Sequence, residues 1–184
     1  MQPNILKVPT NHVLADLNGY QTHAPVLERI LEIFKPKDIL EFGPGKYSTK
    51  LFLDSIPASG SLTCIEMQSQ EWADIVTGLF SSDARFQLHC LLGANAWYEE
   101  DHLLEGRPDL AFVDGHGESR PEVINYLLDW KVPVIMTHDT ECPNYGWDRI
   151  KGNSDYTHWS YRDVVPWTDV FIHNNALSNM LKKG

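Results

Sequence analysis

Hydrophobic and polar positions alternate along the chain with two different periods. In residues 23–35 the apolar side chains recur every three or four positions, which predicts an amphipathic helix that Pro36 ends. Elsewhere, short apolar runs are closed by glycine or by an acidic residue, as is typical of buried strands. Five such strands are predicted, at residues 38–43, 61–66, 86–93, 109–115 and 132–139.

Helices are predicted between these strands, so that the two kinds of element alternate. The predicted helices cover residues 47–56, 70–80 and 121–130, and residues 94–104 are predicted to form a helix or a helical turn. This alternation predicts an α/β fold, a doubly wound Rossmann-like sheet of five parallel strands with helices on both faces. Residues 157–164 and 167–174 are rich in β-branched and aromatic side chains around a proline-containing turn, which predicts an antiparallel hairpin at the sheet edge.

Length and composition indicate one folded domain. With 184 residues, of which 42% are hydrophobic and 22% charged, the chain can bury a sizeable core. We expect a single domain over residues 1–184, with residues 1–20 as an arm packed on it. The net charge of −10 disfavours nucleic acid as a partner, because an acidic surface repels phosphates.

The sequence lacks the patterns of a membrane span and of a secretion signal. Its apolar runs are far shorter than the roughly 20 residues that cross a bilayer, and the first residues lack a basic start followed by an apolar stretch. Cys64, Cys90 and Cys142 are scattered, without the spacing of a zinc site or a disulfide framework. We therefore expect a cytoplasmic protein with no membrane partner.

Polar residues directly follow each predicted strand. Ligands of open α/β sheets bind beyond the carboxyl ends of the strands, so these residues are the candidates for chemistry. They are Glu41 to Gly45, Glu66, Gly93 to Asn95, Asp114 to His116, and His138 to Glu141.

The turn after the first strand has the features of a nucleotide-binding turn. Gly43 and Gly45 allow the backbone to turn tightly and to approach a ligand, and the next helix directs its free N–H groups at the same place. Ser48 and Thr49 add hydroxyl donors. Glu66, about twenty residues further on, can accept hydrogen bonds from both hydroxyls of a ribose.

Two cofactors are compatible with this turn, a nicotinamide dinucleotide and S-adenosylmethionine. Ser48 occupies the position of the third glycine in the dinucleotide fingerprint. Glu41 precedes the turn, where a carboxylate would repel a pyrophosphate but suits an ammonium group. Both features favour S-adenosylmethionine.

The same segments resemble a known family. ILEFGPGKYSTKLFL is similar to the first motif of class I S-adenosylmethionine-dependent methyltransferases, and CIEM, LLGANAW, DLAFVDG and VPVIMTHD are similar to the motifs that follow it, in the same order. The resemblance covers roughly residues 20–175. The FVDG and HD motifs resemble those of the subgroup that includes catechol-type and related small-molecule and sugar O-methyltransferases.

The resemblance implies the class I methyltransferase fold and O-methylation of a small molecule or a sugar. It also implies a set of cofactor contacts from the polar strand ends. These are Glu41, Gly43 and Gly45 for the aminoacyl end, Ser48 and Thr49 for its carboxylate, Glu66 for the ribose, Met67 and Asn95 for the adenine region, and in addition Asp114.

A metal site is implied as well. Catechol-type enzymes hold a magnesium ion through an aspartate after the fourth strand and an Asp-Asn pair after the fifth. Asp114 and Asp139 match the aspartates, and Thr140 stands in place of the asparagine, with Glu141 beside it. Two carboxylates and a hydroxyl suit Mg²⁺, so Asp114, Asp139 and Thr140 are its expected ligands. The alternative is that the two aspartates only form hydrogen bonds.

The proton acceptor is expected near the same strand ends. Gly117 occupies the position of the lysine base of the catechol-type enzymes. His116 and His138 flank the predicted crevice, and an imidazole can accept a proton near neutral pH. The expected catalytic groups, as base, hydrogen-bond acceptor or metal ligand, are Asp114, His116, His138 and Asp139.

Arg120 follows the same crevice in the sequence. Its expected role is an ion pair with Glu118 or Glu122, which lie two residues away on either side. The alternative is that its guanidinium binds an anionic substrate.

Other functions and assemblies remain open. A nicotinamide-dependent oxidoreductase would prefer glycine at position 48. A protein of this fold that uses or senses the cofactor for other chemistry, and a non-catalytic partner subunit, are further alternatives. The last of these is disfavoured because the strand ends keep their polar groups. Since the chain has no large insertion, the acceptor pocket is either shallow or completed by a second subunit of a homodimer.

Overall fold

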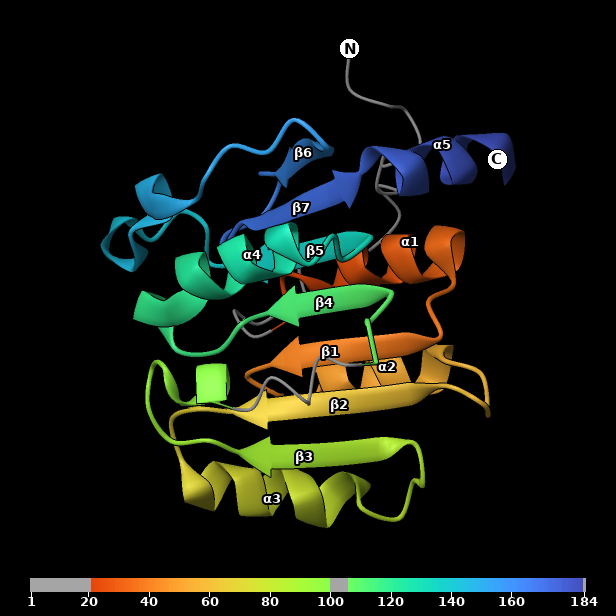
Figure 1. Ribbon diagram of the computed structural model, residues 1–184. Helices are drawn as coiled ribbons and strands as arrows, with labels where there is room; N and C mark the ends of the chain where they lie inside the picture. The colour runs from red at the N-terminus through yellow and green to blue at the C-terminus, as the bar shows by residue number, and fades with distance from the viewer. Residues whose placement is uncertain (1–20, 100–105, 184) are drawn as a thin grey trace.

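The described residues, 21–99 and 106–183 of a computed structural model, form one seven-stranded sheet with helices packed on it (Figure 1). The predicted arm, residues 1–20, lies outside the described residues. The strands follow the order β3-β2-β1-β4-β5-β7-β6 across the sheet. Their bounds are β1 Asp38–Phe42, β2 Ser61–Glu66, β3 Phe86–Cys90, β4 Leu110–Val113, β5 Val134–His138, β6 Tyr156–Tyr161 and β7 Thr168–His173.

Strand order and direction confirm the predicted doubly wound α/β fold. Strands β1 to β5 pair in parallel, and β6 and β7 form the antiparallel hairpin beyond β5. The chain moves outward from β1 to β3 and then returns to place β4 on the other side of β1. This reversal is the switch point at which open α/β sheets bind their ligands.

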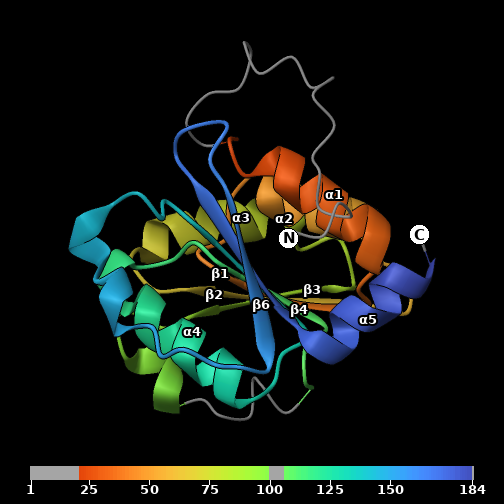
Figure 2. The same ribbon diagram turned by 90° about the horizontal axis from the view of Figure 1, so that it is seen from above.

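Helices α1, α2 and α3 cover one face of the sheet and α4 covers the other, as Figure 2 shows. The side chains of β1 alternate between these faces: Ile39 packs in the core under α1 and α2, and Leu40 and Phe42 pack in the core under α4. Glu41 therefore points toward α2, where its carboxylate meets Thr49. The helix bounds are α1 Ala24–Phe34, α2 Ser48–Ser55, α3 Gln70–Phe80, α4 Arg120–Asp129 and α5 Asn174–Lys183.

The differences from the predicted elements are local. No element is predicted after residue 174, but α5 forms there, with Ala176 and Met180 buried at the four-residue spacing of a helix face. Of the two alternatives predicted for residues 94–104, a helix or a helical turn, the described part forms a 3₁₀ turn at Ala96–Glu99; residues 100–105 lie outside the described chain. Among the helices that the structure describes, none is long and apolar enough to cross a membrane.

Candidate functional site

A cavity of about 790 Å³ lies at the carboxyl ends of β1, β4 and β5. The turn after β1 forms one side of it, with Gly43 and Gly45 in its lining. The ends of β4 and β5 form the other side, with Asp114 and Asp139. One cavity therefore joins residues predicted to bind a cofactor with residues predicted to be catalytic.

Gly43 allows the turn after β1 to pack directly against the turn after β4. Its φ angle is +76°, in the left-handed region, and a Cβ atom on this residue would lie 2.5 Å from the backbone oxygen of Asp114. The backbone N–H of Asp114 in turn donates to the carbonyl of Phe42 at 2.9 Å. These backbone contacts fix Asp114 beside the first turn.

Glu41 is a fully buried carboxylate directly behind this turn, with an exposed fraction of 0%. Thr49 Oγ1 donates a hydrogen bond to Glu41 Oε2 at 2.7 Å and accepts one from the N–H of Gly45 at 3.1 Å. Within the described chain, Glu41 Oε1 has no hydrogen-bond partner. Burial raises the pKa of Glu41 to about 7, so this position favours a bound proton or a neighbouring cation.

The two hydroxyl residues of α2 have different surroundings. Ser48 lines the cavity. Thr49 is fully buried, and its hydroxyl bonds to Glu41 and Gly45 as described. The structure therefore does not support the predicted contact of Thr49 with a cofactor carboxylate, since its only hydroxyl proton is already donated to Glu41.

Three further predicted cofactor contacts lie outside the lining of this cavity. Glu66 Oε1 accepts hydrogen bonds from the backbone N–H groups of Gln68 and Ser69, at 2.7 and 3.0 Å, and so stabilises the turn before α3. Met67 is buried in the core, and the side chain of Asn95 is exposed. Their contacts with the ribose and the adenine of a cofactor stay predictions.

Trp72, which was not predicted as a site residue, lines the cavity instead. It lies in the first turn of α3, and its indole Nε1–H donates to the carbonyl of Pro44 at 2.8 Å. The indole therefore supports the glycine turn from the outside. Nothing in the local sequence distinguishes this tryptophan from one that packs on a helix face.

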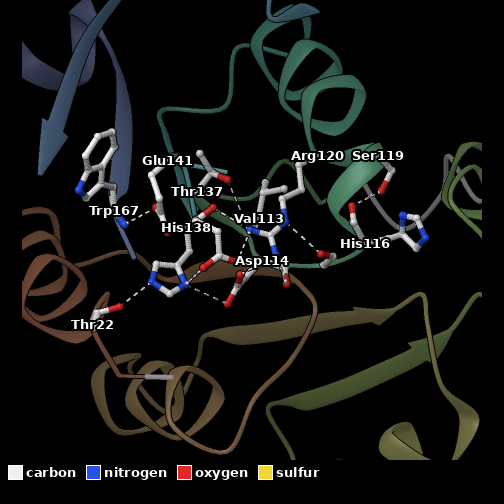
Figure 3. Close-up of polar contacts among 12 residues, drawn as sticks. Thr22, Val113, Asp114, His116, Ser119, Arg120, Thr137, His138, Glu141 and Trp167 are labelled. Atoms are coloured by element: carbon white, nitrogen blue, oxygen red, sulfur yellow. Dashed lines mark hydrogen bonds and ion pairs between the residues drawn. The ribbon is translucent and has the colours of Figure 1, made fainter. Parts of the chain in front are cut away.

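Arg120 lies between the ends of β4 and β5 and binds both aspartates; Figure 3 labels it beside Asp114. Its guanidinium is buried; Nη2 lies 3.0 Å from Asp114 Oδ1, and Nη1 lies 3.1 Å from Asp139 Oδ2. It also donates to the carbonyls of Gly115 and His138 at 3.0 and 2.7 Å. The predicted ion pair of Arg120 with Glu118 or Glu122 is wrong: Arg120 pairs with the two aspartates, and Glu122 forms an ion pair with Arg149 at 2.7 Å.

His138 completes this cluster from the end of β5. Its ring is buried, with Nε2 2.8 Å from Thr22 Oγ1. Its Nδ1 lies 3.4 Å from Asp139 Oδ1 and 3.6 Å from Asp114 Oδ2. Figure 3 shows the approach of His138 to Asp114. Each aspartate therefore directs one oxygen at Arg120 and the other at His138.

The two aspartates have opposite pKa shifts. Burial alone would raise the pKa of Asp114, but the hydrogen bond to His138 and the charge of Arg120 lower it below its ordinary value. For Asp139, burial and the charge of Asp114 raise the pKa despite the same two partners. Asp139 also has a φ angle of +57°, a strained value for a residue with a side chain. Asp139 is consequently the better proton acceptor of the pair.

His23, which was not predicted as a site residue, lines the same cavity. Its exposed fraction is 4%, its ring centroid lies 4.8 Å from that of His138, and burial lowers its pKa to about 4. Within the described chain neither ring nitrogen has a hydrogen-bond partner. The available signal was positional: a helix that leads into β1 must begin near the carboxyl end of the sheet, so the residue before α1 lies at the ligand-binding edge.

Two residues of the predicted catalytic and metal sets are not part of this cluster. His116 points away from Asp114 and His138, and it does not line the cavity (Figure 3). Thr140 Oγ1 donates to Asp169 Oδ1 at 3.1 Å and accepts from Arg162 at 2.8 Å, on the hairpin side of the sheet.

Glu141, the residue considered as a substitute ligand, accepts a hydrogen bond from the backbone N–H of Trp167 at 2.7 Å. With Thr140 and Glu141 bound elsewhere and Arg120 on both aspartates, the predicted Mg²⁺ ligand set is not assembled. The expected site at Asp114, Asp139 and Thr140 therefore does not fit a magnesium ion.

The solved structures that this chain resembles include O-methyltransferases. The O-methyltransferase TomG from Streptomyces achromogenes, involved in tomaymycin synthesis and solved with S-adenosylmethionine, has a TM-score of 0.66 at 20% identity, over 80% of this chain and 78% of that one. The O-methyltransferase from Bacillus cereus, solved with S-adenosylhomocysteine, has a TM-score of 0.67 at 17% identity, over 85% and 82%. The chain has the class I methyltransferase fold.

A third methyltransferase fold, PaMTH1 from Podospora anserina with bound S-adenosylhomocysteine, has a TM-score of 0.60 at 15% identity, over 80% of this chain and 76% of that one. No protein-family model matches the sequence, and no curated protein matches it. The likeness therefore establishes the methyltransferase architecture, and the chemistry has to be inferred from the residues of the cavity.

Proposed function

We propose that this protein is an S-adenosylmethionine-dependent methyltransferase that methylates a hydroxyl oxygen of a small molecule or a sugar. The observation that carries this proposal is the single cavity that joins the glycine turn after β1 to the cluster of Asp114, Arg120, His138 and Asp139. Its volume of about 790 Å³ lies within the range of roughly 300–1,000 Å³ that is usual for ligand pockets.

The turn after β1 fits the aminoacyl end of S-adenosylmethionine. The unpartnered oxygen of Glu41 and the raised pKa of this residue suit a neighbouring ammonium group, which would replace the proton. The N-terminus of α2 and the hydroxyl of Ser48 suit a carboxylate. Both charges of an amino acid thus have a complementary partner at this turn.

When bound, S-adenosylmethionine would supply a methyl group that its sulfonium charge already activates. The chain then has to position a nucleophilic oxygen in line with that group and receive its proton. Asp139 is the group that we assign to the proton, because its pKa is raised and it lines the cavity. Arg120 Nη1 holds one of its oxygens at 3.1 Å, and His138 Nδ1 lies 3.4 Å from the other.

Calorimetric titration of the full chain with S-adenosylhomocysteine and with NAD tests the cofactor assignment. We expect binding of S-adenosylhomocysteine in the micromolar range or tighter and no measurable binding of NAD. S-adenosylhomocysteine resembles the proposed cofactor without its reactive methyl group, so no acceptor has to be known. Preferential binding of NAD would overturn the proposal and favour an oxidoreductase.

Release of S-adenosylhomocysteine from S-adenosylmethionine, measured with a panel of phenols, catechols and sugars, tests the reaction. With an accepted substrate, Asp139→Asn should lower turnover by about 10²–10⁴-fold, the usual contribution of a general base. Its affinity for S-adenosylhomocysteine should stay within a few-fold of the unmodified chain. Asp163→Asn, at an exposed position before β7, is the matched control.

A further inference from the structure

His23 is a buried imidazole that the proposed methyl transfer does not use. It is 4% exposed, and neither nitrogen has a hydrogen-bond partner in the described chain. Burying polar groups without partners costs free energy, so such groups in a folded protein call for an explanation, of which a bound ion is one. Because His23 lines the cavity, its nitrogens are placed where a ligand can reach them.

Two other ligand atoms lie close to this imidazole. One nitrogen of His23, one nitrogen of His138 and one carboxylate oxygen of Asp114 all lie within 4.8 Å of one another. Arg120 holds Asp114 Oδ1 at 3.0 Å, which leaves Oδ2 directed at His138 Nδ1 at 3.6 Å. The three side chains come from the segment before α1, the end of β4 and the end of β5.

We propose that His23, His138 and Asp114 bind a borderline divalent transition-metal ion of the Zn²⁺ type, with its remaining coordination positions open toward the cavity. Imidazole is a preferred ligand of Zn²⁺, Fe²⁺ and related ions, whereas Mg²⁺ prefers oxygen ligands. Two imidazoles and one carboxylate leave coordination sites free, as in catalytic rather than structural metal sites.

Thr22 supports this assignment as an outer partner. Metal-bound histidines usually donate their second ring N–H to a nearby oxygen, which fixes the tautomer. His138 Nε2 lies 2.8 Å from Thr22 Oγ1, so an Nε2–H donor to Thr22 would leave the lone pair of Nδ1 for the ion. Asp139 is not needed as a ligand and keeps its proposed role as proton acceptor.

The charges around the site specify what the ion would bind next. Asp114 and Asp139 carry two negative charges, and Arg120 neutralises one of them. A divalent ion would leave one positive charge in excess, which a deprotonated acceptor oxygen would balance. This step rests on the proposed function and narrows its substrate class to hydroxyl compounds that can ligate a metal ion.

Calorimetric titration of the EDTA-treated full chain with ZnCl₂ tests the site. We expect one Zn²⁺ per chain and much weaker binding of MgCl₂. The Zn²⁺ affinity of His23→Ala should fall by more than about 100-fold, because loss of an outer partner of a ligand already costs about 10–100-fold. The matched control is His173→Ala, because His173 lies at the other end of β7 from Thr168, which pairs with His138. This control should bind Zn²⁺ as the unmodified chain does.

A second measurement avoids substitution altogether. Co²⁺ added to the unmodified chain should give a visible absorption spectrum typical of nitrogen ligation, and Zn²⁺ should abolish it. The proposal is overturned if the unmodified chain shows no saturable Zn²⁺ binding, or if His23→Ala and His173→Ala bind Zn²⁺ equally well. If the same metal-free chain still binds S-adenosylhomocysteine, that outcome removes the metal site and leaves the proposed function intact.

Discussion

Replacing Glu41 with glutamine should stabilise the protein at alkaline pH. The carboxylate is fully buried, Oε1 lacks a partner among the described residues, and burial raises the pKa from 4.5 to about 7. Each tenfold change in proton affinity corresponds to about 1.4 kcal/mol. The buried carboxylate therefore lowers the free energy of unfolding by about 3 kcal/mol once both the folded and the unfolded states are ionised.

The sign follows from which state holds the proton. Between pH 4.5 and about 7 the folded state keeps the proton of Glu41 and the unfolded state has lost it, so stability falls as the pH rises through this window. Glutamine has no proton to lose. The difference between Glu41→Gln and the unmodified chain should grow across the same window and then stay constant near 3 kcal/mol above pH 7.

Urea unfolding at a series of pH values measures this difference. Glu32→Gln, which removes an exposed carboxylate on α1, controls for the change in net charge. In Glu41→Gln, the affinity for S-adenosylhomocysteine at pH 8 should fall at least tenfold, because the ammonium group of the ligand loses its buried counter-charge. A stability difference below about 1 kcal/mol at pH 8 would show that Glu41 is already satisfied without a ligand and would refute the reasoning.

Three further substitutions test the framework of the site. Gly43→Ala should destabilise the fold by about 3 kcal/mol or more in chemical denaturation, because its Cβ would meet the backbone of Asp114. The control is Gly78→Ala in α3, which should be neutral or stabilising because its Cβ would meet no atom within 4 Å. Arg120→Ala should cost about 3 kcal/mol by leaving both aspartates without their cation, and a loss below 1 kcal/mol would show that water replaces the guanidinium. Glu66→Ala should cost about 1–2 kcal/mol and Glu66→Gln less, since glutamine still accepts from the N–H groups of Gln68 and Ser69; equal losses would contradict a capping role.

The fold was predictable because its signals are local and repeated. Each parallel strand is a short apolar run that ends in glycine or a polar residue, and each run is followed by a helix or a turn. The C-terminal helix α5 was missed although Ala176 and Met180 have helical spacing. Its apolar pattern begins directly after β7, so the strand signal of residues 167–174 hides the start of the helix.

The backbone of the site was predictable, and its side-chain partners were not. The prediction that Asp114 and Asp139 approach each other is confirmed, because β4 and β5 are parallel neighbours in the sheet. The predicted ion-pair partner of Arg120 was wrong. Glu118 and Glu122 are near it in the sequence, but Asp114 and Asp139, which come close only after folding, bind it instead. The hydrogen bonds that Glu66 Oε1 accepts from its own turn were not predicted either, and the expected contact of Glu66 with a ribose stays a prediction.

Arg120 determines which cation the cavity can still accept. Its guanidinium binds Asp114 Oδ1 and Asp139 Oδ2. A metal ion that needs all four oxygens of the two carboxylates therefore cannot bind there. The other oxygens, Asp114 Oδ2 and Asp139 Oδ1, face His138 Nδ1. One nitrogen of His23 lies within 4.8 Å of ligand atoms of both His138 and Asp114. A proton or an ion that accepts imidazole ligands can balance the remaining negative charge. The proposed metal ligands therefore include histidines and differ from the expected magnesium ligands. Two residues account for this difference: Arg120, buried in the first turn of α4, and His23, directly before α1.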